Sequence, residues 1–302
     1  MRQLVAQLTG GLGNQMFQYA FGRALSSRHG APLIVDTWSG FWTDRLYRRK
    51  YGLGELPIRV EEAGFRSKSA HQTLAWMAAT RLPTYPGKHK WVTTPFRNIT
   101  LIRELEHRAN IELLEQPLHG KCWLFGYWQS PIYFDSISDE LIAELSPPAP
   151  VNPHLRNLGY KMRDSNSIAV GTRLYEESPD PAFHARDRDQ KTVQQWQTAV
   201  EDIVERNRES EIFVFSTQKS ELHNHINWPS RVRFITNDLG YGLPLDKLWL
   251  LSQCQHHLFN NSSFYWWGAW LSQKNYPTDR QVVVASNNFL NVDCLPAWWT
   301  VF

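Results

Sequence analysis

The second half of the chain alternates short runs of apolar residues with longer amphipathic segments. The apolar runs predict strands at residues 167–172, 211–217, 232–236 and 281–285. Between them, the spacing of apolar residues predicts a helix over 192–208 and a short helix from Lys219. Strands that alternate with helices in this way form a parallel sheet covered on both faces. We therefore expect this half to fold as an α/β domain.

The N-terminal residues predict a β-α-β unit of the same class. Strands are expected at 3–8 and 32–36, and a helix over 14–29 ends at Gly30, a residue that favours helix termination. Residues 37–150 are irregular and rich in aromatic side chains, apart from a buried strand expected within 121–128.

A proline-rich segment, PPAPVNP at 147–153, separates the two halves. It suits neither a helix nor a central strand, so we place a domain boundary there. The 302 residues are enough for two domains, 1–150 and 151–302. We expect two Rossmann-like α/β domains facing a cleft, with the carboxyl ends of their strands directed toward it.

The stretch LDKLWLLSQCQHHLFNNSSFYWWGAWL, residues 245–271, predicts a helix, a short buried strand at 257–259, a polar loop and a second apolar helix. The loop ends in Ser262 and Ser263, whose hydroxyls would lie at the start of that helix. Backbone N–H groups at a helix N-terminus bind phosphate readily, so an anion site is predicted here. The alternative is that one of these serines only caps the helix. Asp246 lies near the start of the preceding helix. It either belongs to the same ligand site or only interacts with the dipole of its own helix.

The N-terminal glycine loop, TGGLGNQ at 9–15, follows the first predicted strand. Gly11 and Gly13 match the first glycines of a dinucleotide-binding motif, but Met16 stands where the third is needed, which argues against a nicotinamide enzyme. Glycines at positions 10, 11 and 13 allow close approach of a ligand to the backbone. The amides of Asn14 and Gln15 both donate and accept hydrogen bonds, which suits sugar hydroxyls or phosphate oxygens.

Arg173 ends the first predicted strand of the second half, where its guanidinium could hold a pyrophosphate with paired donors. A salt bridge to Glu176 or Glu177 is the alternative role. The neighbouring carboxylates of Glu176, Glu177 and Asp180 are candidates for a general base, or else are solvated loop residues. Phe215 and Ser216 end the next strand and are also expected near the ligand.

Several other functions are disfavoured by composition and spacing. The net charge of +3 is too small for a nucleic-acid surface. Three widely spaced cysteines lack metal-ligand spacing and indicate reduced thiols in a cytoplasmic protein. Asp187-Arg188-Asp189 has the spacing of a metal-binding motif, but its flanking arginines favour a solvated turn, and no metal is expected. No signal peptide or transmembrane segment is predicted, and peripheral membrane contact stays open.

Three segments resemble the bacterial α-1,2-fucosyltransferases of glycosyltransferase family 11. They are GGLGNQMFQYAFGRAL at 10–25, FSTQ at 215–218 and DKLWLLSQCQHHLFNNSSFYWWGAWL at 246–271. The resemblance implies an inverting, metal-independent enzyme of the GT-B type, with an N-terminal domain on the acceptor side and a C-terminal domain that binds the donor. It implies GDP-L-fucose as donor and the 2-hydroxyl of a terminal β-galactose as acceptor.

The same resemblance implies roles for individual residues. Asp246 would contact guanine, and Ser262 and Ser263 the phosphates, with Asn261 and Phe264 beside them. Asn14 would lie between donor and acceptor. Arg173 would correspond to the first arginine of the family's HxRRGD segment.

The chain departs from the family within that segment. It has Gly171 in place of the histidine and Glu176 in place of the aspartate. Glu176 or Asp180 would accept the proton of the acceptor hydroxyl. A protein that binds a GDP-sugar or a glycan without transferring it is the alternative function.

Overall fold

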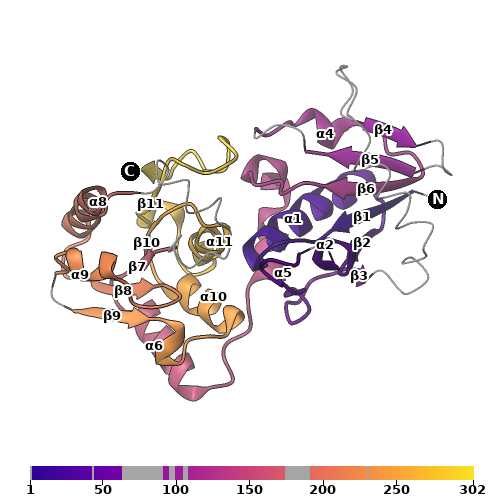
Figure 1. The fold of residues 1–302 in the computed structure, drawn as a ribbon. Coiled ribbons are helices and arrows are strands. Elements are labelled where there is room, and N and C mark those ends of the chain that lie inside the picture. Colours follow the sequence, from indigo (N-terminus) through magenta and orange to yellow (C-terminus); the bar gives the residue numbers. More distant parts are fainter. Residues whose placement is uncertain are drawn as a thin grey trace. The chain divides into compact units, whose positions relative to one another are not determined.

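The computed structural model describes residues 2–42, 44–62, 91–94, 99–104, 108–173, 191–229 and 231–302 (Figure 1). The chain divides into two compact units. The first unit comprises Met1–Glu144 and Leu290–Cys294, and the second comprises Leu145–Phe289 and Leu295–Phe302. The predicted division at residue 150 thus differs in two respects: residues 145–150 belong with the second unit, and residues 290–294 return to the first.

The first unit contains a six-stranded sheet in the order β3-β2-β1-β6-β5-β4. Its strands are β1 Gln3–Gln7, β2 Leu33–Asp36, β3 Glu61–Glu62, β4 Trp91–Thr94, β5 Ile99–Arg103 and β6 Lys121–Phe125. All neighbours are parallel except β4 and β5, which form an antiparallel pair at the edge. Its helices are α1 Leu12–His29, α2 Ser39–Trp42, α4 Glu112–Glu115 and α5 Ser138–Leu145.

The predicted β-α-β unit is confirmed by β1, α1 and β2. Helix α1 buries Phe17 and Phe21 and ends at Gly30, whose φ of 58° lies in the left-handed region that glycine tolerates. The Gly30 N–H donates to the carbonyl oxygen of Ser26. This is the helix end that the sequence predicted.

The second unit contains a six-stranded, fully parallel sheet in the order β12-β11-β10-β7-β8-β9. Its strands are β7 Ser167–Gly171, β8 Glu211–Phe215, β9 Val232–Ile235, β10 His256–Phe259, β11 Val283–Ala285 and β12 Thr300–Val301. Its helices are α6 Pro153–Asp164, α8 Val193–Arg206, α9 Glu221–His225, α10 Pro244–Gln253 and α11 Ser263–Leu271. Numbered within the unit, this is the order 3-2-1-4-5-6 of the Rossmann fold. The predicted class of two Rossmann-like α/β domains is therefore confirmed.

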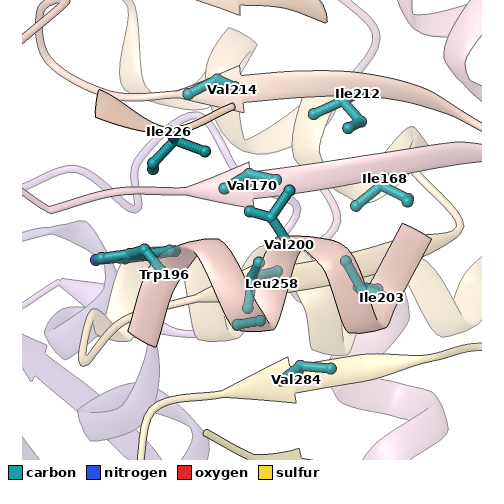
Figure 2. Packing of buried hydrophobic residues seen from close by; sticks show 11 residues of the cluster. Ile168, Val170, Trp196, Val200, Ile203, Ile212, Val214, Ile226, Leu258 and Val284 are labelled. Atoms are coloured by element: carbon teal, nitrogen blue, oxygen red, sulfur yellow. The ribbon is translucent and has the colours of Figure 1, made fainter. Parts of the chain in front are cut away.

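One face of the second sheet packs against α8. Figure 2 shows Trp196, Val200 and Ile203 of this helix lying against apolar side chains from β7, β8, β10 and β11. Successive strand residues point to opposite faces, so Ile168 and Val170 of β7 meet α8, and the residues between them face the other layer. That layer includes α11, because Tyr265 of α11 lies directly over Gly171.

Strand order indicates where a ligand can bind in the second unit. The connections reverse direction between β7 and β10, because β7 leads to β8 and β9 on one side and β10 leads to β11 and β12 on the other. Ligands of open α/β sheets bind beyond the carboxyl ends of the strands at such switch points. No helix among the described residues is long and apolar enough to span a membrane.

Candidate functional site

Asn260 joins the ends of the two strands at the switch point of the second sheet. It follows β10 and is buried. Its Nδ2 donates to the carbonyl oxygen of Arg173 at 2.9 Å, and its Oδ1 accepts from the Arg173 N–H at 2.8 Å. Two hydrogen bonds from one planar amide fix the backbone of Arg173 just beyond β7. The sequence placed Asn260 in the polar loop but did not predict this role.

A second set of hydrogen bonds holds the end of β7 to β8. The Thr172 N–H donates to the carbonyl oxygen of Phe215 at 2.9 Å, and Thr172 Oγ1 lies 2.7 Å from Nε2 of His223. Nδ1 of His223 accepts from the Ser220 N–H at 3.0 Å, so Nε2 carries the ring proton and donates to Thr172. His223 is buried and was not predicted as part of the site.

Gly171 explains one departure from the family pattern. A Cβ atom at this position would lie 2.5 Å from Cγ of Tyr265, which is too close for any side chain. The Tyr265 hydroxyl lies 3.0 Å from the carbonyl oxygen of Phe215 and 3.2 Å from that of Thr172. The tyrosine ring therefore occupies the space that a histidine at position 171 would need.

Ser262 stands at the N-cap position of α11, but its hydroxyl makes no capping hydrogen bond among the described residues. Its N–H donates to the carbonyl oxygen of Asn260 at 2.7 Å, and the residue is buried. Ser263 and Phe264 form the first turn of α11 and are half-buried. The alternative that Ser262 caps the helix through its side chain is thus wrong, and its hydroxyl stays at the helix start, as an anion site requires.

The start of α10 is tied to the ends of β8 and β9. Lys247 is buried, and its Nζ donates to the carbonyl oxygen of Ser216 at 2.9 Å and to Oδ1 of Asn237 at 2.6 Å. Asp246 precedes it in the first turn of α10 and is half-buried. The lysine fixes the helix start that presents Asp246. It was not predicted, although an amine among apolar helix positions is the signal that would have found it.

Phe215 and Ser216, both predicted at the end of β8, differ in the groups that they could present to a ligand. The Phe215 side chain is fully buried in the sheet, so a contact with a ligand would have to come from its backbone at the strand end, and this contact stays a prediction. Ser216 is buried, and its Oγ has no hydrogen-bond partner among the described residues. Such an unpaired hydroxyl is uncommon in a protein interior. Asn261, also predicted, donates from Nδ2 to the carbonyl oxygen of Asn288 at 3.1 Å.

The glycine loop of the first unit connects the carboxyl end of β1 to the start of α1. Gly10 has a φ of 75°, and a Cβ atom there would lie 2.8 Å from Nδ2 of Asn14. Oδ1 of Asn14 accepts from Nε2 of Gln129 at 2.9 Å, and Gln129 follows β6. Gly11 is the N-cap residue of α1, and Gly13 is buried in its first turn. The loop and the residues beyond β6 are therefore joined, with Asn14 half-exposed between them.

Gln15 has a structural role in this loop. Its side chain is buried, and Nε2 donates to the carbonyl oxygens of Gly10 and Lys50, each at 2.9 Å. Its Oε1 accepts from the Gly52 N–H at 2.9 Å. Both donor hydrogens are used by the backbone and the oxygen accepts one backbone hydrogen bond, so Gln15 holds the loop in place, and its ligand contact stays a prediction.

The candidate bases Glu176, Glu177 and Asp180 lie outside the described residues, as does the Asp187-Arg188-Asp189 motif. The role of Glu176 therefore stays a prediction. The described part of the chain holds no group of three His, Cys, Asp or Glu side chains placed to bind a metal ion.

Comparison with known proteins places these features in a family context. A model of glycosyl transferase family 11 matches residues 7–293. An alpha-1,2-colitosyltransferase from Escherichia coli is 28% identical over 285 residues, covering 91% of this chain and 89% of the relative. The O-antigen biosynthesis glycosyltransferase WbnK from Escherichia coli is 25% identical over 287 residues, covering 88% of this chain and 89% of the relative.

Among solved structures, the NodZ alpha-1,6-fucosyltransferase soaked with GDP-fucose aligns with a TM-score of 0.50. The sequence identity is 11%, and the alignment covers 89% of this chain and 92% of NodZ. At this identity the likeness concerns the fold alone. It agrees with the predicted GT-B class.

Proposed function

The chain belongs to glycosyl transferase family 11, and from that premise we propose that it transfers L-fucose from GDP-β-L-fucose to the 2-hydroxyl of a terminal β-galactose. The names of two similar proteins support this proposal. One is an alpha-1,2-colitosyltransferase, and NodZ, which shares the fold, is a fucosyltransferase that was soaked with GDP-fucose.

The observation that carries the proposal is the pairing of Asn260 with Arg173 beside the start of α11. The pairing fixes the arginine backbone at the switch point, and the uncapped hydroxyl of Ser262 lies at the adjacent helix N-terminus. A guanidinium and a helix N-terminus both stabilise negative charge on a pyrophosphate. We assign GDP binding to this site, with Ser263, Asn261 and Phe264 beside the phosphates and Asp246 at the guanine.

The proposed reaction is a direct displacement. The acceptor oxygen attacks the anomeric carbon of fucose while the bond from that carbon to the phosphate oxygen breaks, and the electron pair of that bond leaves with GDP. The hydroxyl proton passes to Glu176 or Asp180, and the anomeric configuration inverts from β to α. Arg173 and the start of α11 stabilise the charge that develops on the leaving pyrophosphate. Because those groups do this, we propose that no metal ion is required.

The colitosyltransferase relative favours a second candidate donor. Colitose is fucose without its 3-hydroxyl, so the same site chemistry would serve GDP-colitose. A donor comparison with one acceptor separates the two candidates.

The test is transfer from GDP-fucose to a panel of β-galactosides in the presence of EDTA, followed by mass and linkage analysis. We expect one deoxyhexose on O2 of galactose. Arg173→Ala should lower kcat/KM by about a hundredfold or more, and Asn260→Ala by about tenfold, because it releases the Arg173 backbone. Asn207→Ala is the control, since Asn207 bonds the carbonyl oxygen of Ile203 at the end of α8.

Several outcomes would contradict the proposal. Loss of transfer in EDTA with recovery on adding manganese would show metal dependence. Tight GDP binding without transfer of fucose or colitose to any galactoside would identify a GDP-sugar-binding protein. Glycan binding with no affinity for GDP would indicate a lectin-like protein.

A further inference from the structure

A pocket of about 330 Å³ opens in the first unit beyond the carboxyl ends of β1, β5 and β6. Its volume lies at the lower end of the range for small-molecule sites, about 300–1,000 Å³. Its polar lining consists of Gln7, Arg103, Glu104, Tyr127, Gln129 and Asn291. None of these side chains except Gln129 has a role in the site described above.

The carboxylate of Glu104 is held in a fixed position. Its Oε2 accepts from the N–H groups of Tyr127 at 2.7 Å and Trp128 at 2.9 Å. A Cβ atom on Gly126 would lie 2.5 Å from Cβ of Glu104, so the backbone approaches the carboxylate as closely as only glycine allows. An ionised carboxylate has about four acceptor sites on its two oxygens, so one held in fixed geometry at a pocket is suited to accept hydrogen bonds from a ligand as well.

The backbone at Trp128 adopts a conformation that is uncommon for a residue with a side chain. Its φ is 55°, and its ring is buried, stacked on Phe21 with the centroids 4.0 Å apart. Strained backbone of this kind occurs mainly at functional sites. Here it buries the Trp128 ring and leaves the preceding Tyr127 39% exposed at the pocket.

The Tyr127 phenol stays protonated over the physiological range. Burial raises the pKa of this group, and the carboxylates of Asp44 and Glu104 raise it further. The ring therefore offers an aromatic face together with a neutral hydroxyl.

The returning segment Leu290–Cys294 forms one wall of the pocket. Nδ2 of the buried Asn291 lies 3.5 Å from Oε1 of Glu104. Oδ2 of Asp293 accepts from the Ala109 N–H at 3.0 Å, and its backbone oxygen accepts from Ser130 Oγ at 2.7 Å. The wall is therefore anchored to the unit on both sides.

We infer that this pocket binds a neutral hexose of the acceptor glycan, with the sugar face on Tyr127 and its hydroxyls on Arg103 and Glu104. This inference rests on the proposed function. Sugar hydroxyls both donate and accept, which matches a guanidinium beside a carboxylate, and the aromatic ring suits the apolar face of a sugar. Arg103 and Glu104 together carry no net charge, and the carboxylate of an acidic sugar would be repelled by that of Glu104. Gln129 connects the pocket to Asn14 of the glycine loop.

The test measures acceptor recognition in Tyr127→Ala and Arg103→Gln. We expect the KM for a β-galactoside to rise about tenfold in each variant, while the Kd for GDP changes by less than about twofold. Ile132→Ala is the control for Tyr127, because Ile132 lies in the same unit, outside the pocket, and is 40% exposed. Arg28→Gln is the control for Arg103, because Arg28 lines a different pocket of the first unit.

A binding measurement keeps this inference separate from the proposed function. Saturation-transfer NMR with methyl β-galactoside reports on the pocket even if the wild-type protein transfers no fucose. We expect a saturation-transfer signal from methyl β-galactoside with the wild-type protein. The signal should be weaker with Tyr127→Ala and unchanged with Ile132→Ala. Equal signal in wild type and Tyr127→Ala, or an acceptor KM within about twofold of wild type in both pocket variants, would overturn the assignment. Equal binding of methyl β-galacturonoside would overturn the preference for a neutral sugar.

Discussion

Two neighbouring histidines in β10 are held in the neutral form. Burial lowers the pKa of His256 to about 4 and that of His257 to about 3. Nδ1 of His256 accepts from the Val282 N–H at 3.0 Å, and Nε2 of His257 lies 3.1 Å from the carbonyl oxygen of Cys254. Each ring is therefore hydrogen-bonded within the protein.

These histidines make stability depend on pH. Their folded-state pKa values lie below the ordinary value of about 6.5, so the unfolded chain binds protons more readily in acid. The stability they contribute is complete above about pH 6.5 and is lost as the pH falls toward about 4, by at most about 1.4 kcal/mol per pH unit for each group. Urea unfolding at about pH 5 and about pH 7.5 measures the loss. His256→Asn should reduce the loss, and an undiminished loss in that variant would contradict the assignment.

At the scale of the element, α8 and α11 begin in different ways. Thr192 caps α8: its Oγ1 accepts from the Gln195 N–H at 3.2 Å, and Oε1 of Gln195 accepts from the Thr192 N–H at 2.9 Å. Ser262 holds the same position on α11 without a capping bond. One helix start is completed by a capping box, and the N-cap residue of the other makes no side-chain capping bond.

This difference predicts opposite effects of two equivalent substitutions. Thr192→Ala should lower the free energy of unfolding by about 1 kcal/mol and leave GDP affinity unchanged. Ser262→Ala should change stability by less than about 0.5 kcal/mol but weaken GDP binding about tenfold, because it removes a hydroxyl from the proposed phosphate site. Urea unfolding and calorimetric titration with GDP measure the two effects. A stability loss in Ser262→Ala with unchanged GDP affinity would restore the capping role.

The elements could be predicted where one physical signal dominates. Buried parallel strands read as apolar runs, so β7 to β11 followed from the sequence. The edge strand β4 and its antiparallel neighbour β5 were not predicted, because they lie within an irregular region of the sequence. The predicted linker overlaps the start of α6, since Pro153 is tolerated in a first helical turn and Asn152 caps it by accepting from His154.

The site contacts were harder to predict than the elements. Asn260 and Arg173 are 87 positions apart, and their pairing exists because β10 lies beside β7. Periodicity identifies both strands but does not give their order. Gln15 shows a related limit: an amide in a glycine loop matches a ligand-binding pattern, and only the fold shows that backbone groups of Lys50 and Gly52 bond to it.

At the scale of the whole molecule, residues 290–294 belong to the first unit although they follow most of the second in sequence. A substitution in this segment should therefore destabilise the first unit and not the second. Asp293→Ala removes the acceptor for the Ala109 N–H, so the opening free energy of amides in α1 and β6 should fall by about 1–3 kcal/mol. Amides in β7 and β8 should exchange as in wild type. Hydrogen exchange measures both sets, and the exposed Asp279, in a short helix of the second unit, provides the control Asp279→Ala. Equal loss of protection in both units would contradict the prediction.

The return of Leu290–Cys294 to the first unit also sets an order of events during synthesis. A ribosome makes β1 to β6 early, yet the wall that Asn291 and Asp293 supply emerges only after β11 has been translated. The first sheet can pair its strands cotranslationally, but its pocket must stay incomplete until the strands from β7 to β11 have also been made. A nascent chain stalled before residue 290 would therefore have the glycine loop and the strand ends but no finished sugar pocket.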